Sequence, residues 1–236
     1  MNPGLVHTIF DFTAWASAFL MGRFIAQRGL LPGPFRTPMR DPGYFIALGL
    51  GAIAGALLFG TSNLMLAGIP QIGHSIAGAV TGGIIAVEIF KRINGIHGST
   101  GAQFVAPLAI GIAVGRWGCF FAGLPDYTYG VPTTLPWGID FGDGISRHPV
   151  QLYESAAMAL FLTVYLAKIA ARSPVFVRQG FYLLVGWYAL QRFVWEFFKP
   201  YPAIVGPFNQ FHLICIAMFA YSLFMMRQNR ELCPAI

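Results

Sequence analysis

The sequence predicts an all-α integral membrane protein with about seven transmembrane helices. Of its 236 residues, 56% are hydrophobic and only 10% are charged, whereas about a quarter of the residues of a soluble domain carry a charge. The mean hydropathy is +0.62, and several apolar stretches are long enough to cross a hydrocarbon core about 30 Å thick. Nothing in the composition indicates a second domain, so we expect residues 1–236 to form a single polytopic membrane domain.

Hydrophobicity locates the seven spans along the chain. We expect them at about residues 5–27, 43–61, 74–92, 102–122, 150–170, 179–198 and 207–227. The first is interpreted as a span and not as a secretory signal, because no basic segment precedes it and the polar His7 and Asp11 lie within it. Small residues in the second, third and fourth spans (GLGAIAG, GAVTGG and GIAVG) predict close helix packing.

The basic residues predict the orientation of these spans. Eleven of the 15 Lys and Arg residues fall on one side of the membrane, and the positive-inside rule makes that side cytoplasmic. The N-terminus is then outside and the C-terminus is cytoplasmic. The net charge of +6 is interpreted as this topology signal, and no nucleic-acid partner is expected. The eleven residues are Arg23, Arg28, Arg36, Arg40, Lys91, Arg92, Lys168, Arg172, Arg178, Arg227 and Arg230.

In this topology the strongly polar residues inside the spans gather in the outer half of the membrane, Glu88 excepted. Arg116 lies about six residues below the outer end of its span, or roughly 9 Å at 1.5 Å per residue. Arg192 has the same depth, with Glu196 one turn above it, and Glu154 lies near the outer start of the fifth span. An ionisable group in a membrane costs at least about 2.5–3.5 kcal/mol and usually faces a cavity or another such group. The pattern predicts a polar chamber that opens outward.

Two arginines on different helices at one depth suit a phosphate, which accepts the forked donors of Arg. Arg147 and His148 add basic groups where the fifth span begins at a proline, and free N–H groups at such a start attract anions. An outer-leaflet compound with a phosphate at this depth is a phospholipid, and the loop at residues 123–149 is expected to cap the chamber. The alternative is purely structural pairing, of Arg192 with Glu196 and of Arg116 with Asp11.

Four motifs resemble a known family in their order and spacing: GRWGCFFAG, YGVPTTLPWGIDF, RHPVQLYES and RFVWEFFK. They are similar to motifs of the bacterial prolipoprotein diacylglyceryl transferases, over roughly residues 72–200. The resemblance implies an enzyme of the bacterial inner membrane whose active site faces the outer leaflet. Such an enzyme moves the diacylglyceryl group of phosphatidylglycerol to a prolipoprotein cysteine thiol and releases glycerol phosphate. We expect no cofactor and no metal site, since three cysteines are too few and too scattered for a metal cluster.

The resemblance also assigns site residues, with two departures. Cys119 stands where the family typically has asparagine, and Ala77 stands where the family has the histidine of an FHGG stretch. The expected catalytic residues are Arg116, Arg192, His148, Glu154 and His74, and the expected substrate-binding residues are Arg147, Tyr153, Gly130, Asp126, Cys119 and Glu196.

Several alternatives stay open at this point. An attacking thiol needs help to become a thiolate, so either His74 or Glu154 supplies a base, or a different acceptor is used. Cys119 either takes part or is an inert small hydrophobe. The chain is therefore expected to be the transferase itself, or a paralogue that keeps the phospholipid-donor site but has a different acceptor or reaction. The third hypothesis is a non-catalytic lipid-binding or transport protein, although the sequence has no internal repeat typical of transporters.

Overall fold

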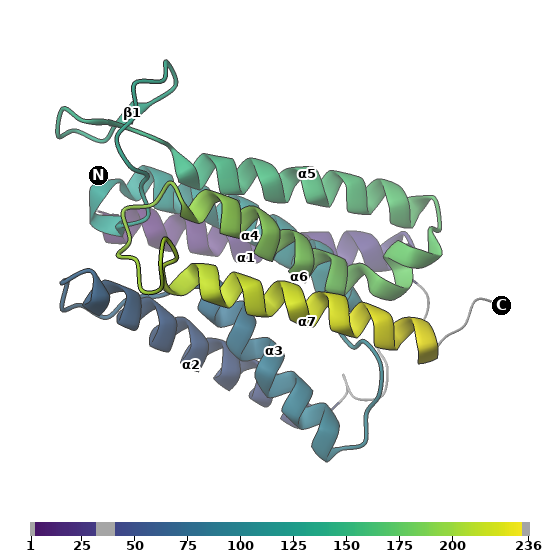
Figure 1. Ribbon diagram of the computed structural model, residues 1–236. Coiled ribbons are helices and arrows are strands. Elements are labelled where there is room, and N and C mark those ends of the chain that lie inside the picture. The colour runs from purple at the N-terminus through teal and green to yellow at the C-terminus, as the bar shows by residue number, and fades with distance from the viewer. Residues whose placement is uncertain (1–2, 32–40, 233–236) are drawn as a thin grey trace. The chain divides into compact units, whose positions relative to one another are not determined.

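The computed structural model describes residues 3–31 and 41–232, where seven long helices match the seven predicted spans (Figure 1). Each helix begins and ends within a few residues of its predicted span, because the same long apolar stretch determines the helix and the prediction. The helices are α1 (Pro3–Gln27), α2 (Pro42–Leu66), α3 (Ile76–Ile93), α4 (Val105–Ala122), α5 (Val150–Ala170), α6 (Pro174–Glu196) and α7 (Gln210–Leu232). Two 3-10 turns, η2 (Ala102–Phe104) and η3 (Leu124–Asp126), flank α4, and a hairpin of β1 (Ile139–Asp140) and β2 (Ser146–Arg147) precedes α5.

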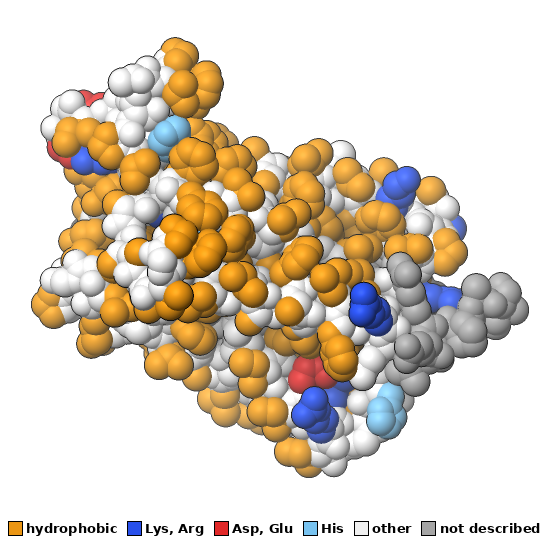
Figure 2. All heavy atoms as spheres, viewed as in Figure 1, with side chains coloured by type: hydrophobic (Ala, Val, Ile, Leu, Met, Phe, Trp, Pro, Cys, Tyr) orange, Lys and Arg blue, Asp and Glu red, His pale blue; other side chains and the backbone are white. Residues whose placement is uncertain are grey.

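The helices have the surface of a membrane protein. Five are long and apolar enough to cross a bilayer: α1, α2, α4 together with η2, α5 and α7. Large apolar side chains stay exposed on them, and in Figure 2 hydrophobic side chains spread along the helices, where few charged side chains are seen, as expected for surfaces that contact lipid. The chain is therefore an α-helical, multi-pass membrane protein, whereas the count of seven spans and the orientation stay predictions. Arg36 and Arg40, on which the orientation partly rests, lie outside the described residues.

The chain divides into two compact units, and the single predicted domain stays a prediction. The first comprises residues 1–31 and 102–200, and in it α4 contacts α1, α5 and α6. Its β1–β2 hairpin projects beyond the end of the helices at which α5 begins (Figure 1). The second comprises residues 32–101 and 201–236, and in it α3 contacts both α2 and α7.

Glycines bring α2 and α3 into backbone contact within the second unit. A Cβ atom added to Gly55 would lie 2.2 Å from the carbonyl oxygen of Gly78, and one added to Gly51 would lie 2.5 Å from that of Gly82. The close packing predicted for these two helices is thus confirmed. The α4 pattern differs, because a Cβ at Gly111 would make only an ordinary contact with α1, at 3.9 Å.

Glu88 of α3, the exception to the predicted outer-half grouping, has a basic partner on its own helix. The Nζ atom of Lys91 lies 2.8 Å from its Oε1 atom, one helical turn away. The hydroxyl of Tyr221 on α7 donates a hydrogen bond of 2.9 Å to the same oxygen. This cluster ties α3 to α7 in the second unit.

Candidate active site

An ion-pair network inside the first unit is centred on Glu154 of α5, whose side chain is 1% exposed. The Nε atom of Arg116 on α4 lies 2.5 Å from Oε2 of Glu154. Arg192 on α6 donates a hydrogen bond to Oε1 through its Nη1 atom. The Nζ atom of Lys199, three residues beyond the end of α6, lies 2.8 Å from the same oxygen. Both oxygens of one carboxylate are therefore in contact with cations that come from separate parts of the chain.

The network carries one more positive than negative charge. Its second carboxylate is Glu196, whose Oε2 atom lies 2.9 Å from Nε of Arg192 one turn earlier on α6. Three cations thus face two carboxylates, and all five residues are at least 93% buried. Buried charges are costly unless they are paired. A network left with an excess charge of +1 favours the binding of an anion.

This arrangement decides between the pairings that the sequence allowed. Arg192 and Glu196 do pair within their helix, and Arg192 also contacts Glu154, which pairs with Arg116. Arg116 pairs with Glu154, and the alternative partner Asp11 is exposed on α1. The structure brings these four residues together, while their roles in a reaction stay predictions.

Lys199 is the member of the network that the sequence analysis missed. It lies just beyond the predicted sixth span, and its side chain is fully buried. The spacing of Arg192, Glu196 and Lys199 by four and then three residues was the available signal, because residues so spaced share one helix face. The pKa of Lys199 is lowered to about 8, chiefly by burial and secondly by the positive charge of Arg192.

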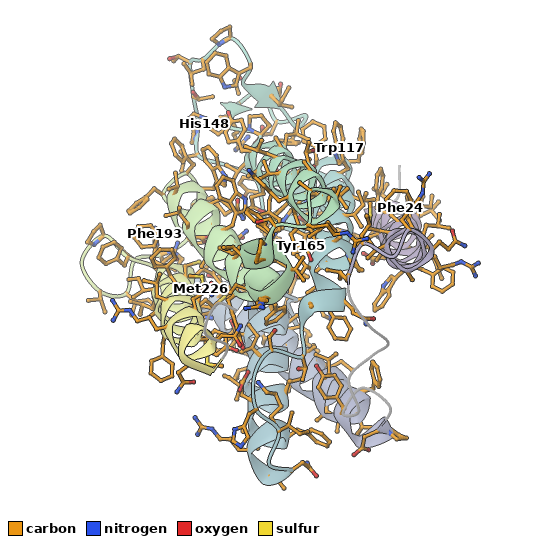
Figure 3. All side chains as sticks on the ribbon, turned by 90° about the vertical axis from the view of Figure 1, so that its right-hand side faces the viewer. Phe24, Trp117, His148, Tyr165, Phe193 and Met226 are labelled. Carbon is orange, nitrogen blue, oxygen red and sulfur yellow. The ribbon has the colours of Figure 1, made fainter. Side chains whose placement is uncertain are left out.

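His148 and Tyr153 form a second cluster where the hairpin meets α5 (Figure 3). The hydroxyl of Tyr153 lies 3.3 Å from Nδ1 of His148 and accepts a hydrogen bond of 2.9 Å from Nε1 of Trp137. The His148 ring also meets the Phe198 ring edge-on, with centroids 4.9 Å apart. These contacts attach the loop that carries the hairpin to the start of α5 and to the residues just after α6. Tyr153 and Phe198 directly precede Glu154 and Lys199 of the ion-pair network in the sequence.

Gly130 and Arg147 maintain the backbone of this loop. The N–H of Gly130 donates to the carbonyl oxygen of His148 at 3.1 Å, and a Cβ on Gly130 would lie 2.4 Å from that oxygen. Glycine is therefore required by the close approach of the two segments. Arg147 donates a 2.6 Å hydrogen bond to Asp143, which holds the pKa of the Asp143 carboxyl below its ordinary value. The guanidinium of Arg147 also lies over the Tyr129 ring. The structure thus engages Arg147 within the hairpin, and its predicted contact with substrate stays a prediction.

Cys119 contacts the ion-pair network, and Asp126 contacts His7, a residue that was not expected in the site. Nη1 of Arg116 lies 3.9 Å from Sγ of Cys119, which links this cysteine to the ion-pair network. Asp126, in η3, lies 2.7 Å through Oδ1 from Nε2 of His7 on α1. His7 was noted only as a polar residue of the first span. Nothing in the local pattern pairs it with a residue more than a hundred positions later.

His74 belongs to the second unit and is exposed just before α3, whose N-cap is Ser75. Ala77, at the position of the family's histidine, is completely buried. The suggestion that His74 serves as a base stays a prediction.

Comparison with known proteins agrees with the motifs. The sequence profile of the prolipoprotein diacylglyceryl transferases matches residues 9–227. A phosphatidylglycerol–prolipoprotein diacylglyceryl transferase of Geobacter sulfurreducens is 32% identical over 226 residues, which cover 89% of this chain and 84% of the relative. The enzyme of the same name from Solidesulfovibrio magneticus is 31% identical over 248 residues, which cover 96% and 89% of the two chains. No significant match was found among solved structures. The profile match and these relatives show that the chain belongs to the prolipoprotein diacylglyceryl transferase family.

Proposed function

We propose that this protein transfers the diacylglyceryl group of phosphatidylglycerol to the cysteine thiol of a prolipoprotein. The observation that carries the proposal is the buried excess of one positive charge among Arg116, Arg192, Lys199, Glu154 and Glu196. The phosphodiester of phosphatidylglycerol carries a single negative charge. Binding of the donor would therefore neutralise the network, and Arg side chains offer the paired donors that phosphate oxygens accept.

The same charges favour the chemical step. The thiolate of the acceptor forms a C–S bond to a glycerol carbon of the donor, and the C–O bond to the phosphate breaks. The departing glycerol phosphate gains a second negative charge, which Arg116 and Arg192 are positioned to stabilise. Glu154 holds both guanidinium groups in place. Because cations occupy its two oxygens, Glu154 serves better as this anchor than as the base that accepts the thiol proton.

We also propose that the site faces the outer leaflet of the bacterial inner membrane. The distribution of basic residues supports this orientation. In this orientation the network and the hairpin both lie toward the outer face. The exposed Trp137, two residues before β1, then suits the headgroup level. Both substrates of the proposed reaction would then reach the network from the outer face.

The test is transfer of label from radiolabelled phosphatidylglycerol to a lipobox peptide, with measurement of the released glycerol phosphate. The purified Arg116→Ala variant is expected to lose at least 100-fold in kcat/KM, in the range of a lost oxyanion donor, at about 10²–10³-fold. Arg178→Ala is the matched control, since Arg178 is exposed on the same helix as Arg192 and its replacement removes an equal charge. Full activity of a folded Arg116→Ala protein would refute the proposal.

A second candidate function is transfer from the same donor to a different acceptor. It is favoured by Ala77 and Cys119, the two positions that depart from the family pattern. Expression in a strain that lacks its ordinary transferase separates the two candidates. Rescue of growth supports the prolipoprotein as acceptor, whereas donor turnover by the purified protein without rescue supports the second candidate.

A further inference from the structure

Three metal-ligating side chains converge beside the ion-pair network. His7 comes from α1, Cys119 from α4 and Asp126 from η3, all within the first unit. A ring nitrogen of His7, Sγ of Cys119 and a carboxylate oxygen of Asp126 all lie within 4.8 Å of one another. The proposed mechanism uses none of the three. Imidazole, thiolate and carboxylate are also the three side-chain types that bind Zn²⁺.

We infer that His7, Cys119 and Asp126 form a zinc site with an open fourth position. Tetrahedral zinc with bonds of about 2.0–2.3 Å sets its ligand atoms roughly 3.3–3.7 Å apart. His7 and Asp126 lie closer than that range, at 2.7 Å, and all three ligand atoms lie within 4.8 Å of one another. Small rotations of side chains therefore suffice. Three protein ligands and one free position are the pattern of catalytic zinc sites, whereas structural sites have four protein ligands.

Neighbouring groups orient two of the ligands. The hydroxyl of Thr128 donates to Oδ2 of Asp126, which leaves Oδ1 on the side of His7. Arg116 donates a weak hydrogen bond to Sγ of Cys119. Hydrogen bonds of this kind fix the direction and basicity of metal ligands in known sites.

The charge of the loaded site suits its position. Zn²⁺ bound by one thiolate, one carboxylate and a neutral imidazole has no net charge, so the metal would add no uncompensated charge beside α1 and α4. All three side chains are partly accessible, so an ion and an acceptor thiol can reach them.

The inference gives this site a role in the proposed transfer, and that role rests on the proposed function. The acceptor's thiol binds at the fourth position and releases its proton to solvent, because a metal-bound thiol is deprotonated. Its sulfur then attacks the glycerol carbon of the donor. The C–S bond forms, the C–O bond breaks, and glycerol phosphate leaves with both electrons of that bond. Zinc would thus activate the thiol in a chain that has Ala77 where the family has its histidine.

Metal content measured independently of activity tests the site. The full-length protein, purified without a histidine tag, is incubated with Zn²⁺, dialysed against zinc-free buffer and analysed by mass spectrometry of the metal. We expect about one zinc per chain in the unmodified protein. We expect less than a tenth of that in each of His7→Ala, Cys119→Ser and Asp126→Asn. Cys215→Ser and His97→Ala are the controls, since each removes a similar ligand from the second unit, and they should retain the metal.

Co²⁺ provides a test whose first measurement needs only the unmodified protein. The unmodified protein loaded with Co²⁺ should show thiolate-to-metal charge-transfer absorption, and Cys119→Ser should not. Absence of that absorption, or zinc retention equal in the unmodified protein and Cys119→Ser, overturns the site. Full transfer activity in zinc-free protein overturns its role and leaves the proposed function intact. Zinc binding in a protein that turns over no donor supports the site and counts against the proposed function.

Discussion

The charge of Lys199 makes the proposed donor site sensitive to mildly alkaline pH. Its Nζ atom contacts the central carboxylate at 2.8 Å, and its positive charge supplies the network's excess over two carboxylates. The pKa of Lys199 is lowered from 10.5 to about 8, chiefly because burial disfavours the charged form. The charge is therefore present below pH 8 and is lost as the pH rises through that value. Replacement by arginine keeps the charge over this whole range, since the guanidinium is not deprotonated in proteins.

The expected size of the effect follows from the titration. With a pKa of about 8, roughly ten of eleven Lys199 side chains are protonated at pH 7 and about one of eleven at pH 9. If donor binding requires the net positive charge, kcat/KM for phosphatidylglycerol falls about tenfold over these two pH units relative to Lys199→Arg. The assay is the initial rate of label transfer at low donor concentration, measured in both proteins at half-unit steps of pH.

The ratio of the two proteins' kcat/KM values is the informative quantity. Ionisation of the acceptor thiol raises both rates as pH increases, so it cancels in the ratio. A ratio that stays constant from pH 7 to pH 9, with both proteins folded and active, would refute the argument that the Lys199 charge completes the donor site.

Three further predictions concern stability and loop geometry. Glu154→Gln leaves buried cations without their shared carboxylate, and we expect a loss of about 3–5 kcal/mol of stability, measured by thermal or denaturant unfolding in detergent. Gly130→Ala places a methyl group 2.4 Å from the carbonyl oxygen of His148, so proteolysis of the hairpin should become faster, and unchanged cleavage would contradict this geometry. Gly55→Ala should destabilise the second unit by about 1–3 kcal/mol through overpacking, whereas Gly49→Ala on the same helix, where a Cβ meets nothing within 4 Å, should be neutral.

Hydropathy was sufficient to locate all seven helices, because an apolar run of about 20 residues has few alternatives to a membrane helix. It also predicted that Arg116, Arg192 and Glu154 share the outer half of the membrane; the structure brings the three side chains together, and their depth stays a prediction. Small-residue patterns correctly predicted close packing for α2 and α3, although not that these two helices are each other's partners. These successes concern features that a single segment contains.

The residues that were missed depend on contacts between segments. The helical spacing of Lys199 from Arg192 and Glu196 is visible in sequence, but its contact with Glu154 on α5 depends on the fold. His7 and Asp126 are brought together by the packing of α1 against α4 and by the turn that follows α4. Arg147 pairs with Asp143 of the hairpin, a contact that its place before α5 did not reveal, while its predicted contact with substrate stays a prediction. No periodicity within one helix records such neighbours.

Synthesis of the chain proceeds from α4 to α5 and then to α6, so Arg116 is made before its carboxylate partner. A lone charged side chain inside a bilayer costs at least about 2.5–3.5 kcal/mol. The arrival of Glu154 on α5 offsets this cost, and Arg192 and Lys199 then add to a carboxylate that is already buried. Membrane insertion of α4 therefore becomes more favourable once α5 has been synthesised. In a nascent chain truncated after residue 123, α4 should be inserted less stably than in one truncated after residue 170.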